Sequence, residues 1–345
     1  MIAVVSASNS VGPSSPREWA DREHERLATG DLKETAATAE AILTKIVDAV
    51  ETVIHGKRVA VEVVVASMLA EGHVLIEDVP GVGKTMLARA LAAVTGLSTG
   101  RVQFTADLLP SDVTGTGIWD PRTGELRFRS GPIFANVLLA DEINRATAKT
   151  QAALLEAMEE RHVTADGETH VLPRPFLVLA TQNPMEHEGT YRLPESQLDR
   201  FLARISLGYP DSASELQMLE HDGGEALIGQ LRAQTTTEEL RALIERTQRV
   251  HMANRLRLWL LELVNATRQH PAIALGASPR ATLALQRLAR ARAVIAGRTF
   301  VVPDDVLGVF PEAIAHRIVG ANPGRTDLVA TLDEIVRRVG VPRSA

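Results

Sequence analysis

The amino-acid sequence predicts an α/β fold, in which a parallel, five-stranded sheet is flanked by helices and followed by an all-helical domain. Three observations support this prediction. Short apolar segments alternate with helical patterns between residue 73 and about residue 230, as in parallel sheets with helices on both faces. A glycine-rich loop joins the first of these segments to a helix. Beyond about residue 230 the strand patterns stop and only helical patterns follow.

Five short apolar segments are the expected strands, and helical segments such as KTQAALLEAMEE separate them. These strands are expected at residues 73–77, 101–106, 136–141, 175–182 and 203–208. Two hairpins interrupt the alternation. The first, GIWDPRTGELRFR, turns at residues 121–124, and the second, HVTADGETHVL, turns at Asp166 and Gly167.

Three regions follow along the chain. Residues 1–34 mix Ser, Pro, Asp and Glu, so we expect a flexible N-terminal tail. Residues 35–225 form the expected α/β core, which opens with two helices over 36–72. Residues 226–345 form the expected helical domain, with helices in TTTEELRALIERTQRV, RLRLWLLELVNATRQ, SPRATLALQRLARARAVIAG and DLVATLDEIVRRV.

Composition narrows the class of protein. The chain has 345 residues, 45% hydrophobic and 23% charged, which is ordinary for a soluble globular protein of two domains. The absence of cysteine excludes disulfides, thiolate metal sites and cysteine nucleophiles, and the ten histidines show no metal-ligand spacing. The N-terminus lacks the pattern of a signal peptide, and no apolar run approaches the length of a membrane span. We therefore expect a cytoplasmic protein without a transmembrane segment.

The net charge of -6 is unevenly distributed. From residue 232 onward, 17 arginines and 10 acidic residues give +7, whereas the first 231 residues carry 20 basic and 33 acidic groups. An acidic body with a basic C-terminal part is unlike a nucleic-acid binder, which presents an overall basic face. Opposite signs in two parts of one chain suit contact between them, within a subunit or between neighbours. A solvated, arginine-rich helical surface is the alternative.

The stretch HVLIEDVPGVGKTMLARAL, residues 73–91, predicts a strand, a phosphate-binding loop and a helix. Gly81 and Gly83 allow backbone N–H groups to curl around phosphates, Lys84 neutralises the outer phosphates, and Thr85 can hold Mg²⁺. The N-terminus of the helix adds its partial positive charge. A plain glycine-rich turn is the alternative interpretation.

Asp78 stands where the strict phosphate-loop pattern has its first glycine. A carboxylate that pointed at a triphosphate would repel it. We therefore expect the Asp78 side chain to point away from the site, so that nucleotide binding survives.

Two further strands end in polar residues. VLLADEINR ends its apolar run with Asp141 and Glu142, and an acid at the carboxyl end of a buried strand can hold Mg²⁺ through its water shell. The next acid can polarise an attacking water molecule. Asn183 ends the following strand and could orient that water beside the γ-phosphate. Surface acids and a plain Asn-Pro turn are the alternatives.

Two arginines are candidates for contact with a terminal phosphate. In GASPRATLAL, Ser278 is the expected N-cap and Pro279 the first helical residue, so Arg280 lies in the first turn, where a cation opposes the helix dipole. A γ-phosphate would supply the anion that Arg280 requires, and a solvated arginine is the alternative. Arg200, in LPESQLDRF, is either an arginine finger or the partner of Asp199 in a local ion pair.

Taken in order along the chain, the loop, the DE strand, the QN strand, LDRF and GASPRA resemble the AAA+ ATPases, and in particular their MoxR branch. The resemblance covers residues from about 40 to 340. It implies a P-loop NTPase core with strand order five-one-four-three-two, a helical lid, bound ATP and Mg²⁺, and a homo-oligomeric ring, usually a hexamer. The two hairpins match the helix-2 and pre-sensor-1 insertions of that clade.

The resemblance also implies roles for individual residues. Asp141 and Glu142 become the Walker B acids, Asn183 becomes sensor 1, Arg200 the finger that acts on the next subunit's ATP, and Arg280 sensor 2. Thr85 and Asp141 are the implied Mg²⁺ residues. The implied nucleotide contacts are Pro80, Gly81, Val82, Gly83, Lys84, Thr85, Met86, Ile54 and Gly56. The last two lie in VIHGK, where the family's base-contacting segment falls, and His55 there and Asp78 are the departures.

The implied activity is ATP hydrolysis coupled to chaperone-like remodelling of a protein partner, and the resemblance suggests a partner with a von Willebrand factor A-type domain. The first loop expected to face a ring pore, TADLLPSDVTGTG, lacks the aromatic-apolar-Gly signature of threading unfoldases, which favours pushing or reshaping. Trp119 is a candidate working tip, or else a half-buried hairpin aromatic. The alternatives are a nucleotide-dependent binding switch with little turnover, a metal-chelatase-like motor subunit, and a nucleic-acid motor, which the net charge disfavours.

Overall fold

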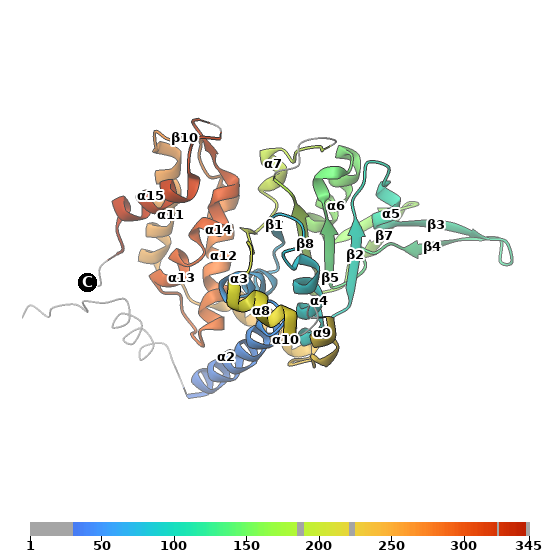
Figure 1. Ribbon diagram of the computed structural model, residues 1–345, viewed down its shortest axis with the longest axis horizontal. Helices are drawn as coiled ribbons and strands as arrows, with labels where there is room; N and C mark the ends of the chain where they lie inside the picture. The colour runs from blue at the N-terminus through green and yellow to red at the C-terminus, as the bar shows by residue number, and fades with distance from the viewer. Residues whose placement is uncertain (1–29, 185–189, 221–224, 323, 343–345) are drawn as a thin grey trace, which may run out of the picture.

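The computed structural model describes residues 30–342 except residues 185–189, 221–224 and 323. Its centre is a five-stranded sheet in the order β2-β5-β8-β1-β9, in which each pair of neighbours is parallel (Figure 1). The five predicted strands and their implied order are confirmed. The strands are β1 (Val74–Glu77), β2 (Thr99–Gln103), β5 (Val137–Asp141), β8 (Leu177–Gln182) and β9 (Ala203–Ile205).

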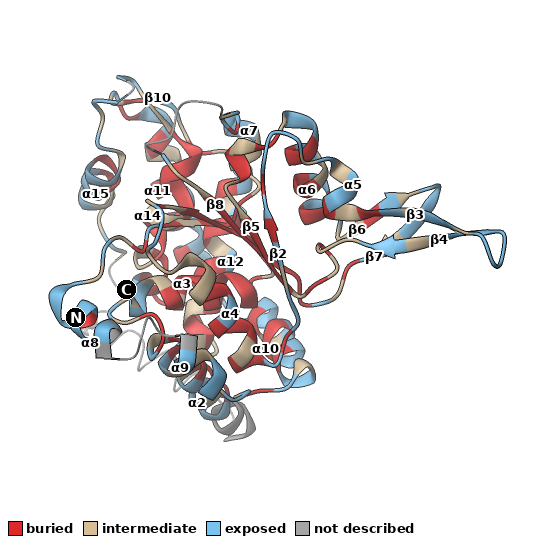
Figure 2. Ribbon diagram, turned by 45° about the vertical axis from the view of Figure 1, so that its right-hand side comes forward, coloured by how far each residue is buried: buried red, intermediate tan, exposed pale blue. Residues whose placement is uncertain are grey.

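The central strands of the sheet are buried on both faces, which explains their continuous apolar sequences (Figure 2). In β1, Val74 and Ile76 belong to one hydrophobic cluster, and Leu75 belongs to a second cluster. Successive side chains of a strand point to opposite faces, so the two clusters lie on opposite sides of the sheet. Asp141 is the residue at which the buried run of β5 ends.

The larger cluster joins the sheet to the C-terminal helices in one continuous core. Helix α12 contacts both α3 and α2, so the first helices of the chain lie between the sheet and the helical region. The helices that contribute to this cluster include α2 (Gly30–Glu51), α3 (Arg58–Leu69), α4 (Lys84–Thr95), α10 (Thr237–Arg249), α11 (Asn254–Gln269) and α12 (Pro279–Ile295).

The other face of the sheet carries α5 (Pro110–Thr114), α6 (Ala148–Glu160) and the two predicted hairpins, which are confirmed. Strands β3 (Gly115–Asp120) and β4 (Glu125–Ser130) form an arm that projects from the body (Figure 1). Strands β6 (His162–Ala165) and β7 (Glu168–Val171) form the second hairpin. The Gly117 N–H donates to the Asp166 carboxylate (2.8 Å), and the Phe128 and His170 rings stack at 3.8 Å. These contacts join the two hairpins.

The prediction of an all-helical C-terminal region is wrong in one detail. Strands β10 (Ile273–Leu275) and β11 (Val319–Gly320) pair antiparallel there. They are only three and two residues long, too short to give a strand pattern in the sequence. The remaining elements are η1 (Ile143–Arg145), α7 (Glu195–Leu198), α8 (Ser212–Glu220), α9 (Glu225–Gln230), α13 (Pro303–Leu307), α14 (Phe310–Ile314), η3 (Ala315–Arg317) and α15 (Leu328–Val339).

The expected N-terminal tail falls mostly on residues 1–29, which lie outside the described residues. Helix α2 begins at Gly30, so the last five residues assigned to that tail belong to a helix instead. Within the described part of the chain, each helix is too short or too polar to cross a membrane.

Candidate nucleotide site

The phosphate loop connects the carboxyl end of β1 to the start of α4. Gly81 (φ +86°) and Gly83 (φ +96°) adopt backbone conformations that favour glycine, and Gly83 is the N-cap of α4. Lys84 and Thr85 therefore lie in the first turn of a 12-residue helix, where unpaired N–H groups attract an anion. Pro80, Val82 and Met86 complete the loop and that first turn.

Asp78 points away from the loop, as predicted. Its carboxylate accepts hydrogen bonds from the Leu207 N–H, the Gly208 N–H (3.2 Å) and the Ser206 hydroxyl (3.1 Å), all in the segment after β9. The side chain is buried, so it fastens the start of the loop to the neighbouring strand and faces no phosphate. The backbone carbonyl of Asp78 accepts from Lys84 Nζ (2.9 Å).

Lys84 lies close to the acids of the neighbouring strand. Partial burial lowers the pKa of its ammonium group, and the charges of Asp141, Asp78 and Glu142 oppose that effect. A cation half-withdrawn from water and faced by carboxylates is suited to exchange its contacts for phosphate oxygens.

Asp141 and Glu142 are held by one threonine of the adjacent strand. The Thr181 hydroxyl donates to Asp141 Oδ1 (2.6 Å) and accepts from the Glu142 N–H (2.9 Å). Glu142 has φ +56°, a left-handed conformation that few non-glycine residues adopt and that functional sites often contain. Sequence analysis missed Thr181, because its contact with the two acids depends on the register of β8 against β5.

The carboxylates of both acids also contact groups that sequence analysis missed. Arg101 pairs with Asp141 Oδ2 (2.9 Å). The Gln103 side-chain amide donates to Glu142 Oε2 (2.9 Å), and Arg145 forms an ion pair with the same oxygen (2.9 Å). The register of β2 against β5 places Gln103 beside Asp141, but that register is not evident from the sequence. Glu142 is therefore restrained by β2 and by the turn that follows it.

Asn183 and the expected base-contacting segment lie at the same edge of the sheet as the loop. Asn183 directly follows β8, the strand between β1 and β5. Ile54 is buried, and its Cδ1 lies 3.6 Å from the position that a Cβ on Gly83 would take. Gly56 (φ +68°) adjoins the start of α8, and Lys57 Nζ donates to the Tyr209 carbonyl (2.8 Å). His55, between Ile54 and Gly56, is half-buried.

The oxygens at this edge fit a magnesium ion. Thr85 supplies a hydroxyl and Asp141 a carboxylate, and Mg²⁺ is usually held by one or two such groups together with phosphates and water. No cluster of three or more His, Asp or Glu side chains suited to a metal occurs among the described residues. The described part of the chain therefore contains no metal site that is built wholly from such side chains.

Arg200 and Arg280 lie together, but at the opposite end of β1. The Leu202 N–H donates to the His73 carbonyl (2.8 Å), which places the segment after Arg200 beside the amino end of that strand. Arg280 Nη2 lies 2.7 Å and Arg200 Nη1 3.4 Å from the two carboxylate oxygens of Glu159. The structure thus brings the two predicted arginines together and separates both from the phosphate loop of the same chain.

The local predictions about these arginines have mixed outcomes. Ser278 is the N-cap of α12, where it accepts from the Ala281 N–H (3.1 Å), and Pro279 is the first helical residue, as predicted. The interpretation of Arg200 as the ion-pair partner of Asp199 is wrong. Asp199 contacts Arg317 (3.1 Å) and accepts from the Ser278 hydroxyl (2.9 Å), because its side chain faces the helical region.

A cavity of about 470 Å³ is lined in part by Arg200, Glu159 and Arg280. Burial lowers the pKa of the Arg161 and Arg287 guanidinium groups and lowers that of Arg317 to about 10. The charged residues that line it are Arg161, Arg200, Arg280, Arg287, Arg317, Glu71, Glu159 and Asp199.

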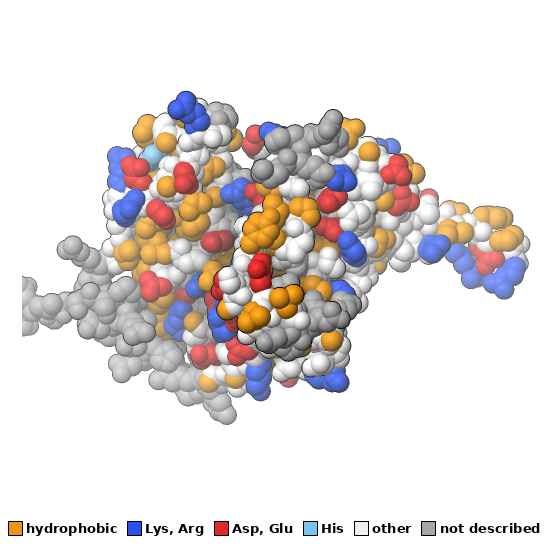
Figure 3. Space-filling view, in the orientation of Figure 1, with side chains coloured by type: hydrophobic (Ala, Val, Ile, Leu, Met, Phe, Trp, Pro, Cys, Tyr) orange, Lys and Arg blue, Asp and Glu red, His pale blue; other side chains and the backbone are white. Residues whose placement is uncertain are grey.

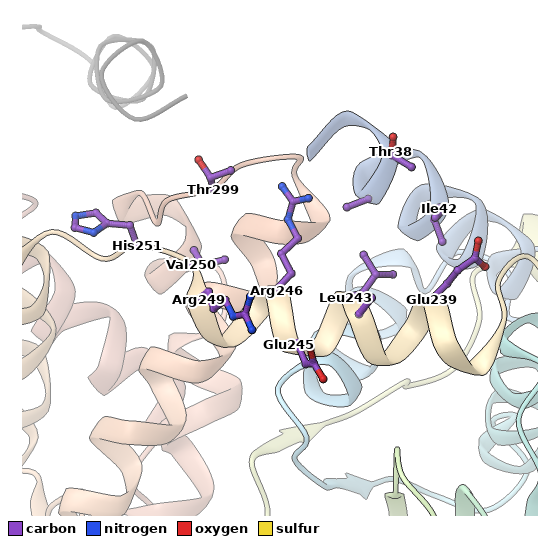
Figure 4. Close-up of a pocket in the computed structure, with 12 residues that line it drawn as sticks. Thr38, Ile42, Glu239, Leu243, Glu245, Arg246, Arg249, Val250, His251 and Thr299 are labelled. Atoms are coloured by element: carbon purple, nitrogen blue, oxygen red, sulfur yellow. The ribbon is translucent and has the colours of Figure 1, made fainter. Parts of the chain in front are cut away.

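A larger cavity of about 670 Å³ lies between α2 and α10, and its lining includes none of the predicted site residues (Figure 4). Its lining is mostly apolar and includes Ile42, Leu243 and Arg246. Size alone therefore does not identify the site at which the polar residues converge.

Comparison with known proteins agrees with this geometry. Residues 73–203 match the model of the ATPase family associated with various cellular activities, and residues 265–339 match that of the AAA lid domain. The chain is 46% identical over 304 residues to the uncharacterized protein YeaC of Bacillus subtilis, covering 87% of this chain and 95% of that protein. It is 40% identical over 306 residues to chaperone MoxR1 of Mycobacterium tuberculosis, covering 85% and 81%.

A solved structure shows the same architecture. It is that of a protein from Cytophaga hutchinsonii provisionally described as an ATPase, with a TM-score of 0.83 and 35% sequence identity. The match covers 90% of this chain and 97% of the other, so it includes both the sheet and the C-terminal helical region.

Proposed function

The chain belongs to the MoxR-type AAA+ ATPases, and from that premise we propose that it is a Mg²⁺-dependent, ATP-hydrolysing ring protein that remodels or matures a protein partner. The observation that carries the proposal is the separation of two groups of residues along one strand. The phosphate loop lies at the carboxyl end of β1, and Arg200 and Arg280 lie at its amino end.

The carboxyl end of the sheet would bind and activate ATP. Lys84 and the loop N–H groups hold the phosphates, and Thr85 and Asp141 hold Mg²⁺, which neutralises charge on the phosphates. Glu142 polarises the attacking water, and Asn183 orients that water. Ile54 and Gly56 contact the base. The products are ADP and phosphate.

The arginines at the amino end would act on a neighbouring subunit's ATP. The loop and the arginines are separated by β1, a four-residue strand, and therefore by roughly 13 Å along the strand direction. A ring in which the amino end of one sheet faces the carboxyl end of the next brings them together. A hexamer is the ring size that the family favours.

The partner would be a protein, and one with a von Willebrand factor A-type domain is the candidate that the family resemblance suggests. The β3–β4 arm offers a contact surface for it, because Trp119 and Leu126 are cross-strand neighbours with 61% and 56% of their surface exposed. Figure 3 shows hydrophobic and basic side chains together along this arm. The half-buried alternative for Trp119 is wrong. Binding of nucleic acid is not expected, and the cytoplasm remains the expected compartment.

A nucleotide-dependent switch with little turnover is the second candidate. It is favoured by the contacts of Gln103 and Arg145 with Glu142, because a carboxylate that is held by two donors is less available to a water molecule.

The test is ATP turnover per subunit, measured with Mg²⁺ over a range of protein concentrations. Specific activity that rises with concentration supports catalysis across a subunit interface. Activity that is present but flat leaves a stable ring or a working monomer, and sedimentation velocity separates these. The absence of turnover at every concentration, with a candidate partner also present, would favour the switch.

A further inference from the structure

The feature of interest is the carboxylate of Glu159, which two candidate catalytic arginines share. Arg280 Nη2 lies 2.7 Å from Glu159 Oε1, and Arg200 Nη1 lies 3.4 Å from Glu159 Oε2. The three residues come from the end of α6, the first turn of α12 and the turn after α7. The two oxygens of Glu159 therefore link Arg200 of the sheet region to Arg280 of the helical region.

Helix dipoles explain why these residues need each other. Glu159 lies in the last turn of α6, which contains no basic residue, and an anion there is unfavourable. Arg280 lies in the first turn of α12, where a cation is equally unfavourable. Asp199, which accepts from the N-cap Ser278, and the C-cap Arg161 also lie at these helix ends, and the Glu159–Arg280 pair adds a further countercharge to each end. The anion that Arg280 requires is thus supplied within the chain.

The other carboxylates that line the cavity have partners of their own, which leaves Glu159 to pair with Arg200 and Arg280. Asp199 pairs with Arg317, and Glu71 pairs with Arg174 outside the cavity (2.7 Å). Arg161 and Arg287 donate to backbone carbonyls, among them that of Glu71. Among the described residues that line the cavity, Glu159 is therefore the carboxylate that remains for Arg200 and Arg280.

The Glu159 pairs are also easy to displace. The side chains of Glu159, Arg280 and Arg200 are 39%, 49% and 31% exposed. Ion pairs at that exposure are weak, and a terminal phosphate carries more charge and more acceptor oxygens than one carboxylate.

We propose that Glu159 occupies the place of the γ-phosphate of a neighbouring subunit's ATP and holds Arg200 and Arg280 until that phosphate displaces it. Glu159 is then a positioning residue that sets the threshold for nucleotide-dependent assembly. The inference rests on the proposed ring ATPase, because it requires a neighbour's nucleotide to reach the cavity.

The test compares Glu159→Gln with the wild-type protein and with a matched control, Glu156→Gln. Glu156 lies one turn earlier on α6, is exposed, and has no ion pair or side-chain hydrogen bond in the described part of the chain. Sedimentation velocity with Mg²⁺ and the ATP analogue AMP-PNP gives the protein concentration at half-assembly. ATP turnover against concentration gives the same midpoint and the plateau rate.

Glu159→Gln is expected to lower the half-assembly concentration with AMP-PNP by roughly threefold to tenfold, because two exposed ion pairs no longer have to be broken. The plateau rate should stay unchanged. Without nucleotide the variant should assemble no better than the wild type, since its arginines then repel one another. Salt screens exposed pairs, so about 0.5 M salt should narrow the difference. Glu156→Gln should behave like the wild type.

A gain of this kind, present only with nucleotide, is not produced by structural damage. An unchanged or raised midpoint for Glu159→Gln, in a preparation whose wild type assembles with AMP-PNP, would overturn the role of Glu159 and leave the ring ATPase intact. If the wild type neither assembles nor shows concentration-dependent turnover, the ring proposal fails and this inference fails with it. Should Glu159→Gln be poorly folded, Glu159→Ala provides the same comparison.

Discussion

The two ends of the central sheet differ in how fully the chain satisfies its own charges. At the carboxyl end, Asp141 and Glu142 have cationic or hydrogen-bonding partners from β2 and from the turn after β5, and Asp78 accepts from backbone N–H groups and from the Ser206 hydroxyl. At the amino end, five arginines share a cavity with three acids. The difference indicates that the acids at the carboxyl end are satisfied by contacts within the chain, whereas the cavity at the amino end is lined by two more cations than anions.

The largest expected effect comes from Arg200. If it acts on a neighbour's ATP, Arg200→Ala should lower the maximal turnover rate by roughly 10³–10⁵-fold, the value of an arginine finger. ATP binding to the loop of the same subunit should persist, as measured by fluorescence titration with a labelled nucleotide.

Mixing provides the decisive control for Arg200. Arg200→Ala retains Glu142, and Glu142→Gln retains Arg200, so mixed rings contain some interfaces with both groups intact. Mixing the two inactive variants should restore part of the activity. If mixtures stay as inactive as either variant alone, Arg200 does not act across the interface, and the contrast between the two ends loses its functional meaning.

A somewhat smaller effect is expected at the carboxyl end. Glu142→Gln should lower turnover by roughly 10²–10⁴-fold, because a neutral amide cannot take a proton from the attacking water. The affinity for ATP should change little, since the loop and Lys84 are untouched. Rapid-quench measurement of a single turnover separates binding from chemistry, and unchanged turnover would remove Glu142 from the role of base.

Sequence analysis was effective at the carboxyl end because short motifs determine it. In parallel strands the carboxyl ends share one edge, so a loop after one strand and acids after another must meet there. Lys84, Asp141, Glu142 and Asn183 could therefore be placed together without coordinates. Thr181 and Gln103 could not, because their contacts depend on strand register.

The amino end could not be assembled from the sequence in the same way. Arg200, Arg280 and Glu159 meet only because α12 packs against the sheet region, a contact between segments more than 100 residues apart. Glu159 lies in an ordinary run of helical acids, and no motif distinguishes it from Glu156 or Glu160. The prediction that Arg280 needs an anion identified the right requirement without showing that this chain meets it.

Low pH should destabilise the amino end of the sheet selectively, because a buried histidine lies there. His73 Nε2 donates to the Met158 carbonyl (3.1 Å), and its Nδ1 accepts from the Val178 N–H (3.0 Å), so both ring nitrogens are engaged in the neutral form. Burial, together with the charges of Arg161 and Arg287, lowers the pKa of His73 to about 3.

The sign of the pH dependence follows from linkage. The unfolded chain protonates His73 near its ordinary pKa of about 6.5, but the folded chain does not until about pH 3. Stability is therefore lost as the pH falls below about 6.5, by about 1.4 kcal/mol per pH unit, or about 2 kcal/mol at pH 5. Urea unfolding at pH 7.5 and pH 5 should show a smaller pH dependence for His73→Gln than for the wild type. His251→Gln, at an exposed position, is the matched control; an equal pH dependence in all three proteins would contradict the assignment.

The smallest effect on the nucleotide is expected from Asp78→Gly, which restores the strict loop pattern. The Asp78 carboxylate faces the segment after β9, and its backbone does not adopt the positive φ that would demand glycine. ATP affinity should change by less than about threefold, or roughly 0.6 kcal/mol. The free energy of unfolding should fall by about 1–3 kcal/mol, because the Leu207 N–H becomes a buried donor without an acceptor. Calorimetric titration with ATP and urea unfolding measure the two quantities on one preparation. A tenfold gain in affinity at unchanged stability would mean that the carboxylate does act on the phosphates. In that case the acids at the carboxyl end of the sheet would not be satisfied by contacts within the chain alone.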